Sequence, residues 1–267
     1  MCRRTGIGSQ AFEDSNDVDR YTGIHFEFSR LRDEVQCVSR LAKPFLLRDC
    51  HHLLSGWESD LVSIASSRTV SQVGWQISEA NPLRTKVTRG YEPAARQGAH
   101  EVWGELSFLW EVRRVSLTDR DTKGRICLSG NASTKVRICK QSQGARSVLA
   151  QWQIEVGTHD SPGWHFHVGL CGEGDDLPFP HWLSVPRVPG LMILPSDAVD
   201  FLLGELFQTD WQQTVSKDCY ETAKLGRYQS DRINRLGAWH TKALGSGGGS
   251  AWNRLKHCKP HEEIFVE

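Results

Sequence analysis

The segment GWHFHVGL, residues 163–170, holds two histidines one residue apart in an otherwise apolar run. Histidine is a frequent metal ligand, and its charge changes near neutral pH. Side chains two apart on a strand leave the same face, with Cβ atoms roughly 6 to 7 Å apart at a rise of about 3.3 Å per residue. His165 and His167 can therefore converge on one ion or one phosphate group.

The preceding apolar segment offers a carboxylate to the same face. In SVLAQWQIEV, residues 147–156, apolar residues alternate with polar ones, which leaves Gln153 and Glu155 on the polar face. If a hairpin through GTHDSPG joins the two segments, the register that keeps both apolar faces on one core sets Glu155 opposite His165 and Gln153 opposite His167. We expect a cluster of one carboxylate and two imidazoles.

Two histidines and one carboxylate suit a divalent metal such as zinc, manganese or iron, and they leave coordination positions open to water. A metal-bound water is nucleophilic near neutral pH. The leading hypothesis is a hydrolase of a phosphodiester or related substrate, with Glu155, His165 and His167 as catalytic groups and metal ligands. Without a metal, Glu155 could orient His165 as an acid/base group.

Further polar residues could complete a ligand site. The candidates for ligand binding are Arg187, His181 and Gln153, with Arg187 as an anion contact. Arg187 and His181 both belong to the proline-rich segment 171–195. The turn residues His159 and Asp160 could reach the same end of the sheet. Three basic residues would favour a phosphate if the intervening strands keep their alternation: Arg113, Lys135 and Arg137.

Two other interpretations also fit these residues. Histidine, glutamine and glutamate are ordinary occupants of a half-solvated sheet face. The chain could also be a non-catalytic interaction module that binds a protein partner through the sheet face or through segment 171–195, where Phe179 and Trp182 lie among prolines.

The remaining motifs are weaker. DTK at 121–123 resembles half of a nuclease core but falls in an expected turn, and DCHH at 49–52 and HCKPH at 257–261 each lack four metal ligands. GSGGGS at 245–250 lacks the Lys-Ser/Thr ending of a phosphate-binding loop and is interpreted as a flexible connector. The sequence contains neither the G-x-S-x-G nor the G-x-G-x-x-G motif.

Composition bounds the class of protein. The 267 residues include 39% hydrophobic ones and carry 32 basic and 32 acidic groups, so no long-range field favours nucleic acid. No apolar run approaches the roughly 20 residues of a membrane span, and no signal sequence is recognisable, so we expect a soluble cytoplasmic protein. The eight dispersed cysteines are expected to be reduced.

The part of the chain before the expected sheet shows the periodicity of helices. Apolar residues at three- and four-residue spacing predict a helix over about 29–42, which Pro44 ends or kinks. A second helix is expected over about 45–65, with an interruption at Gly56, and VGWQIS predicts a short strand.

Two-residue alternation then begins near residue 105. A strand along EVWGELSFLWEVRRVSL is followed by the shorter candidates RICLS and KVRIC and by the two strands that hold Glu155 and the histidines. Short loops between them predict an antiparallel meander. The prolines of 171–195 favour a long connection or an edge. Helices are expected from about Ser196, packed on the sheet, and from about 212 to 236, with Gly226 as a weak point.

Together these patterns predict an α+β fold in which an antiparallel β-meander of four to five strands, spanning about 101–170, is flanked by N-terminal and C-terminal helices. The expected organisation is a flexible N-terminal arm over 1–28, one domain over 29–244, and the Gly-rich connector with the C-terminal tail over 245–267. Trp252, Leu255, Ile264 and Phe265 of this tail could return to the domain.

Overall fold

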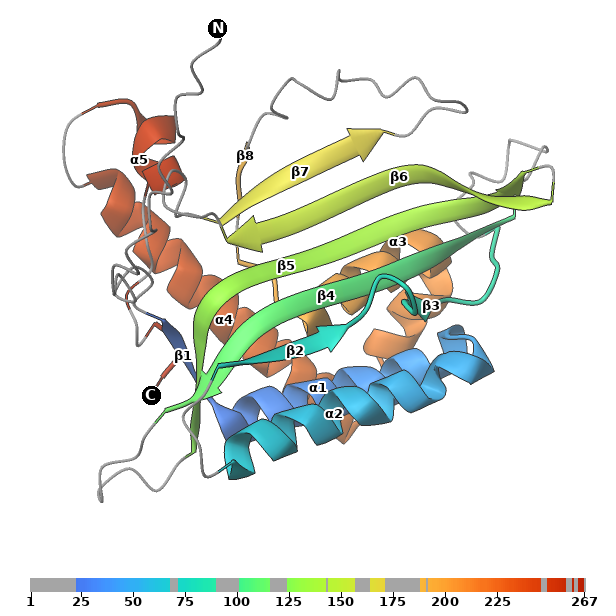
Figure 1. Ribbon diagram of the computed structural model, residues 1–267, viewed down its shortest axis with the longest axis horizontal. Helices are drawn as coiled ribbons and strands as arrows, with labels where there is room; N and C mark the ends of the chain where they lie inside the picture. The colour runs from blue at the N-terminus through green and yellow to red at the C-terminus, as the bar shows by residue number, and fades with distance from the viewer. Residues whose placement is uncertain are drawn as a thin grey trace, which may run out of the picture.

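A computed structural model describes residues 23–67, 72–89, 101–115, 124–142, 144–156, 164–170, 188–190, 192–245, 249–257, 261 and 264–266. The fold is α+β, as predicted, and is built on an eight-stranded antiparallel sheet (Figure 1). Six strands follow in the order β2 (Val73–Ile77), β4 (Val102–Arg114), β5 (Arg125–Ser142), β6 (Ala145–Val156), β7 (Trp164–Leu170) and β8 (Val188–Pro189). Two shorter strands complete it: β1 (Ile24–Glu27) pairs with β5, and β3 (Leu83–Arg84) pairs with β4.

The predicted meander is the run β4-β5-β6-β7, in which each strand pairs antiparallel with the next. Alternation along β4 sends Leu106, Phe108 and Trp110 into the core, each at most 3% exposed. One hydrophobic cluster takes in residues from β1 to the C-terminal segment, including Ile154 of β6 and Trp164 of β7. This shared inner face fixes which side chains leave the opposite, outer face of the sheet.

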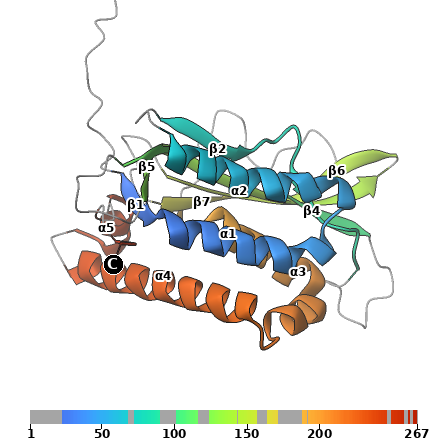
Figure 2. The ribbon, with the colours of Figure 1, turned by 90° about the horizontal axis from the view of Figure 1, so that it is seen from below.

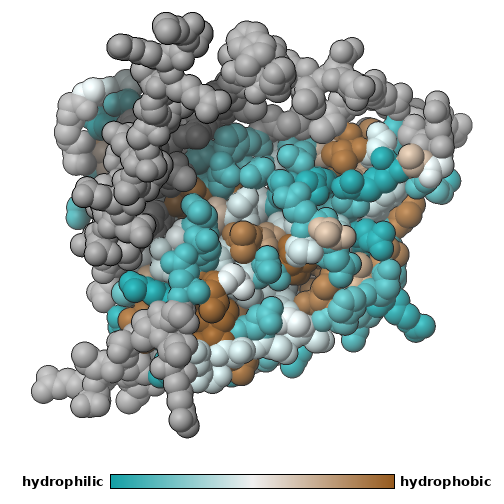
Figure 3. All heavy atoms as spheres, in the orientation of Figure 1, coloured by the Kyte–Doolittle hydropathy of each residue, from teal (hydrophilic) through white to brown (hydrophobic). Residues whose placement is uncertain are grey.

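The helices lie on the inner side of the sheet. Their bounds are α1 (Phe28–Ala42), α2 (His51–Ser66), α3 (Pro195–Val215), α4 (Tyr220–Gly245) and α5 (Ala251–His257). In Figure 1 the outer face of the sheet is turned to the viewer, with α3 and α4 behind the strands. Figure 2 shows α1 between the sheet and α4, which forms the outermost layer. The outer face is mainly hydrophilic, with scattered apolar side chains (Figure 3).

The predicted helix over 29–42 is confirmed as α1, and VGWQIS forms β2. The second helix was predicted to start too early: two short 3₁₀ turns, Lys43–Phe45 and Arg48–Cys50, precede α2. The expected interruption at Gly56 does not occur, and α2 runs through this residue without a break. The candidates RICLS and KVRIC are one continuous strand, β5, of 18 residues.

Segments near both ends of the chain contribute to the core, the C-terminal one as expected and the N-terminal one more than expected. The N-terminal arm was predicted to extend to residue 28, but residues 24–27 form β1, and Ile24 and Phe26 are buried. The C-terminal tail returns to the same place: Ile264 and Phe265 are buried, and Phe265 stacks on Phe26 with ring centroids 5.3 Å apart. Trp252 does not take part, since it is 67% exposed.

The predicted helix from Ser196 is confirmed as α3, which packs on β4. The helix expected over 212–236 is displaced: α3 continues to Val215, and α4 begins only at Tyr220 and passes through Gly226. The proline-rich segment reaches the sheet as the edge strand β8. Within the described residues, no helix has both the length and the apolar character that a membrane crossing requires.

Candidate metal centre

Strands β6 and β7 hold the candidate residues in the register that the sequence predicts. Glu155 pairs with His165 and Gln153 with His167, while the alternate pair Ile154 and Phe166 belongs to the apolar face. Because the apolar residues of both strands join one core, the carboxylate and both imidazoles leave the outer face together. The hairpin loop that joins the two strands lies outside the described residues.

The two imidazoles converge on a single carboxylate oxygen. Nε2 of His167 lies 2.8 Å from Oε1 of Glu155, and Nε2 of His165 lies 3.2 Å from the same oxygen. The imidazole rings meet edge to face, with centroids 4.8 Å apart. In the part of the chain that the structure describes, this is the one group of three side chains whose ligand atoms could hold a metal ion.

These separations match those between neighbouring ligands of one ion. Nitrogen and oxygen ligands about 2.0 to 2.2 Å from a metal lie about 3 to 3.5 Å from each other in tetrahedral or octahedral geometry. The two nitrogen–oxygen distances fall at or just below this range, and all three ligand atoms lie within 4.8 Å of one another, which is close enough for one ion after adjustment of the side chains. The same distances also describe two hydrogen bonds from imidazole to carboxylate.

A neighbouring amide orients the second oxygen of the carboxylate. Nε2 of Gln153 donates to Oε2 of Glu155 at 2.8 Å and lies 3.1 Å from Oγ of Ser133 on β5. Gln153 thus acts on Glu155 in this structure, although the sequence suggested it as a ligand-binding residue. A fixed outer oxygen leaves Oε1 directed at the two imidazoles.

The electrostatic balance keeps Glu155 ionised. Partial burial alone would raise the pKa of its carboxyl group, but the charge of His167 and hydrogen bonds from Gln153 and His165 outweigh burial and lower the pKa below its ordinary value. At neutral pH the site therefore presents a negatively charged carboxylate between two imidazoles, a set of donors that suits a divalent cation.

Exposure differs among the three side chains. His165 is buried, whereas the side chains of His167 and Glu155 are 23% and 27% exposed. The edge strand β8 runs beside His165, with Pro189 opposite it in register, and Gly190 donates to the carbonyl of Trp164. A ligand at the centre would therefore meet solvent on the side of His167 and Glu155.

Several predicted site residues lie outside the described residues: His181, Arg187, His159, Asp160 and the segment 121–123. The motif at 49–52 has other contacts, since Cys50 is buried near the carbonyl of Pro82 and Nε2 of His51 lies 3.2 Å from the carbonyl oxygen of Lys43. The motif at 257–261 is only partly described.

Two of the three predicted basic residues lie near the triad. In register, Lys135 faces Gln153 and Arg137 faces Gln151 across β5 and β6, whereas Arg113 pairs with Cys127 towards the other end of β5. Both Lys135 and Arg137 bind the carboxylate of Glu79. Glu79 is not among the site residues predicted from the sequence. The only sequence signal for Glu79 is a polar turn directly after VGWQIS.

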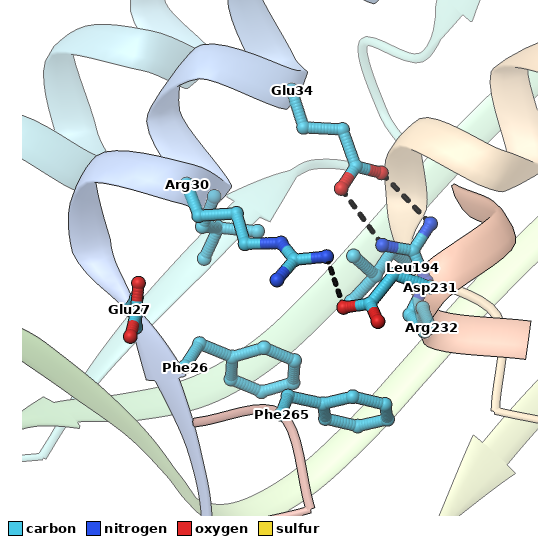
Figure 4. A pocket seen from close by; sticks show the side chains of 9 residues that line it. Phe26, Glu27, Arg30, Glu34, Leu194, Asp231, Arg232 and Phe265 are labelled. Atoms are coloured by element: carbon cyan, nitrogen blue, oxygen red, sulfur yellow. Dashed lines mark hydrogen bonds and ion pairs between the residues drawn. The ribbon is translucent and has the colours of Figure 1, made fainter. Parts of the chain in front are cut away.

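A cavity between β1, the helices α1 and α4 and the C-terminal segment is shown in Figure 4. Four of its five charged side chains pair with one another, Arg232 with Glu34 and Arg30 with Asp231, while Phe26 and Phe265 cover one side. Its volume of about 20 Å³ holds about one water molecule. It is too small for a substrate.

Comparisons of the chain with protein-family models, with curated proteins and with solved structures found no match in any of the three.

Proposed function

We propose that the chain is a metal-dependent hydrolase of a phosphodiester or related substrate, with zinc or manganese held by Glu155, His165 and His167. The observation that carries the proposal is the convergence of both Nε2 atoms on Oε1 of Glu155, at 2.8 and 3.2 Å. An ionised carboxylate and two imidazoles suit zinc or manganese, and three protein ligands leave room for water.

The chemistry follows from the open coordination positions. A cation held by Glu155, His165 and His167 would lower the pKa of a water molecule and so supply a nucleophile near neutral pH. Attack of the water oxygen on phosphorus would break the bond from phosphorus to the leaving oxygen, which would take up a proton from solvent. One water molecule is consumed, and the products are an alcohol and a phosphate ester.

Metal content tests the ligand set directly. Untagged wild-type protein, loaded with zinc or manganese and dialysed, is expected to retain about one ion per chain by elemental analysis, whereas His165→Ala, His167→Ala and Glu155→Gln lose it. Gln153→Ala is expected to weaken metal binding by about 10- to 100-fold, the usual effect of removing a residue that orients a metal ligand. Hydrolysis of bis(p-nitrophenyl) phosphate should fall with the metal content.

His52→Ala is the matched control because His52 is an exposed histidine of α2, away from the site. It should leave metal content unchanged, and circular dichroism should show that each variant keeps its fold. A wild-type protein that retains neither ion would overturn the proposal. The sheet face, where Leu109 is 42% exposed, would then favour the non-catalytic interaction module.

A further inference from the structure

A pair of cations on the outer sheet face binds a carboxylate from a distant turn. Nζ of Lys135 donates to Oε1 of Glu79, and Nη2 of Arg137 donates to Oε2 at 2.5 Å. The side chains of Lys135 and Arg137 are only 16% and 14% exposed, whereas that of Glu79 is 55% exposed. The cations thus belong to the sheet surface, and the carboxylate reaches them from the solvent side.

Lys135 lies in the same register row of the sheet as His167 of the candidate metal centre, and Arg137 is the next outer-face residue along β5. Lys135 is opposite Gln153, which is opposite His167, so two strand spacings separate Lys135 from the histidine. At about 4.8 Å per spacing, the backbone positions are on the order of 10 Å apart. A small molecule can span this distance and contact both the cation pair and the metal centre.

A cavity of about 230 Å³ opens beside Lys135. It is lined by Glu79, Ser107, Leu109, Ser133 and Lys135, among others. Ser133 pairs in register with Glu155, so the cavity extends towards the triad. It combines the ion-paired Lys135 and Glu79, three serine hydroxyl groups and the apolar side chain of Leu109, which is a suitable lining for a small polar ligand with an apolar part.

The charge around the cation pair favours an anion. Glu105 is the carboxylate opposite Arg137 in register, but both of its oxygens are bound by Arg146, at 2.9 and 2.5 Å. Glu79 therefore supplies the carboxylate for both Lys135 and Arg137. One carboxylate carries a single negative charge against two positive ones, so a dianion would neutralise the pair more completely.

We propose that Lys135 and Arg137 form a phosphate-binding subsite that Glu79 occupies when no ligand is bound. Its role in substrate binding rests on the proposed hydrolase function: the substrate is a small molecule with a terminal phosphate group at this subsite and with its reacting bond at the metal centre. A phosphate dianion matches the two cations in charge, and the arginine fork matches its oxygens in geometry.

Titration of metal-free protein with inorganic phosphate tests the subsite without the metal. By calorimetry, Glu79→Gln should bind phosphate about five- to tenfold more tightly than wild type, because a partly exposed ion pair no longer competes. Lys135→Gln should weaken binding, and the double variant Lys135→Gln/Arg137→Gln should abolish it. Acetate should bind more weakly than phosphate to Glu79→Gln.

Glu101→Gln is the matched control, since it also releases an arginine from a surface ion pair, Arg89–Glu101 at 2.7 Å. It should not change phosphate affinity. Equal phosphate affinities of wild type and Glu79→Gln, or a gain of equal size in Glu101→Gln, would overturn the subsite. Because these titrations contain no metal, loss of the metal centre and loss of the subsite give separate results.

Discussion

At the scale of single residues, Glu155 has three hydrogen-bonding or ionic partners on two oxygens. Oε1 faces both imidazoles, and Oε2 accepts from Gln153. The charge of this carboxylate holds the cluster together, whether or not a cation is bound. Its protonation should therefore be visible in the stability of the protein as well as in metal affinity.

The pKa of Glu155 is lowered below its ordinary value of 4.5 in the folded protein. A lowered pKa stabilises the folded state above the pKa of the unfolded chain, and this stabilisation is lost as pH falls through the folded value. We expect Glu155→Gln to lower the free energy of unfolding of metal-free protein by about 1 kcal/mol at pH 7. Urea denaturation should show this difference shrinking below pH 4.5, and a difference that grows on acidification would contradict the assignment.

The three residues of the centre could be found from sequence, but Glu79 could not. Two-residue alternation places Glu155, His165 and His167 on one face, and a shared core leaves few registers for the strands that hold them. Glu79 lies in a turn and reaches Lys135 across 56 positions in sequence. Because a turn has no periodic pattern, no local feature assigns its side chain to a partner on the sheet.

At the scale of elements, β5 shows how pairing overrides a local turn signal. Gly130 and Asn131 interrupt its apolar pattern and suggest a break. In the structure β5 continues as one strand but carries a bulge here: residues 129–131 of β5 oppose the single residue Glu111 of β4, which accepts a hydrogen bond from the backbone N–H of Asn131 at 2.7 Å. A Cβ on Gly130 would lie 2.1 Å from Oε2 of Glu111, so this glycine marks a close approach of the carboxylate.

The contact between α3 and β4 depends on another glycine. A Cβ on Gly104 would lie 2.5 Å from Cδ1 of Leu202 and 2.8 Å from Cδ1 of Leu206, both buried. We expect Gly104→Ala to destabilise the protein by about 1 to 3 kcal/mol, the usual cost of overpacking a core. Urea denaturation measures this change.

Gly226 provides the matched control for this substitution. It is exposed within α4, and a Cβ there would meet no atom within 4 Å. Gly226→Ala should therefore stabilise the protein by about 0.5 to 1 kcal/mol through helix propensity. If both alanine variants shift stability in the same direction, the packing argument for Gly104 fails.

At the scale of the whole molecule, one buried ion pair joins three helices. Arg232 of α4 donates to both oxygens of Glu34 of α1, at 2.7 and 2.8 Å, and also binds Asp197 in the first turn of α3. Ser196 donates to Glu34 at 2.7 Å. The network fixes how the helices that cover the sheet meet, on the side of the sheet opposite the candidate metal centre.

Removal of one partner should cost more than removal of both. Arg232→Met leaves the carboxylate of Glu34 buried without its main partner, and we expect a loss of about 3 to 5 kcal/mol in the free energy of unfolding. The double variant Glu34→Met/Arg232→Met should recover part of this loss, because no uncompensated charge remains there. Chemical denaturation of the wild type, the two single variants Glu34→Met and Arg232→Met and the double variant gives the coupling energy. Additive effects of the two substitutions would rule out a direct interaction.

The edges of the sheet bear on how copies of the chain behave at high concentration. On the side of β7 the last strand, β8, has two residues and ends in proline, which carries no backbone N–H group. On the other side β2 has five residues, including Gly74. Short margins of this kind offer a foreign strand few backbone groups to pair with, which disfavours edge-to-edge association of molecules at β2 and β8.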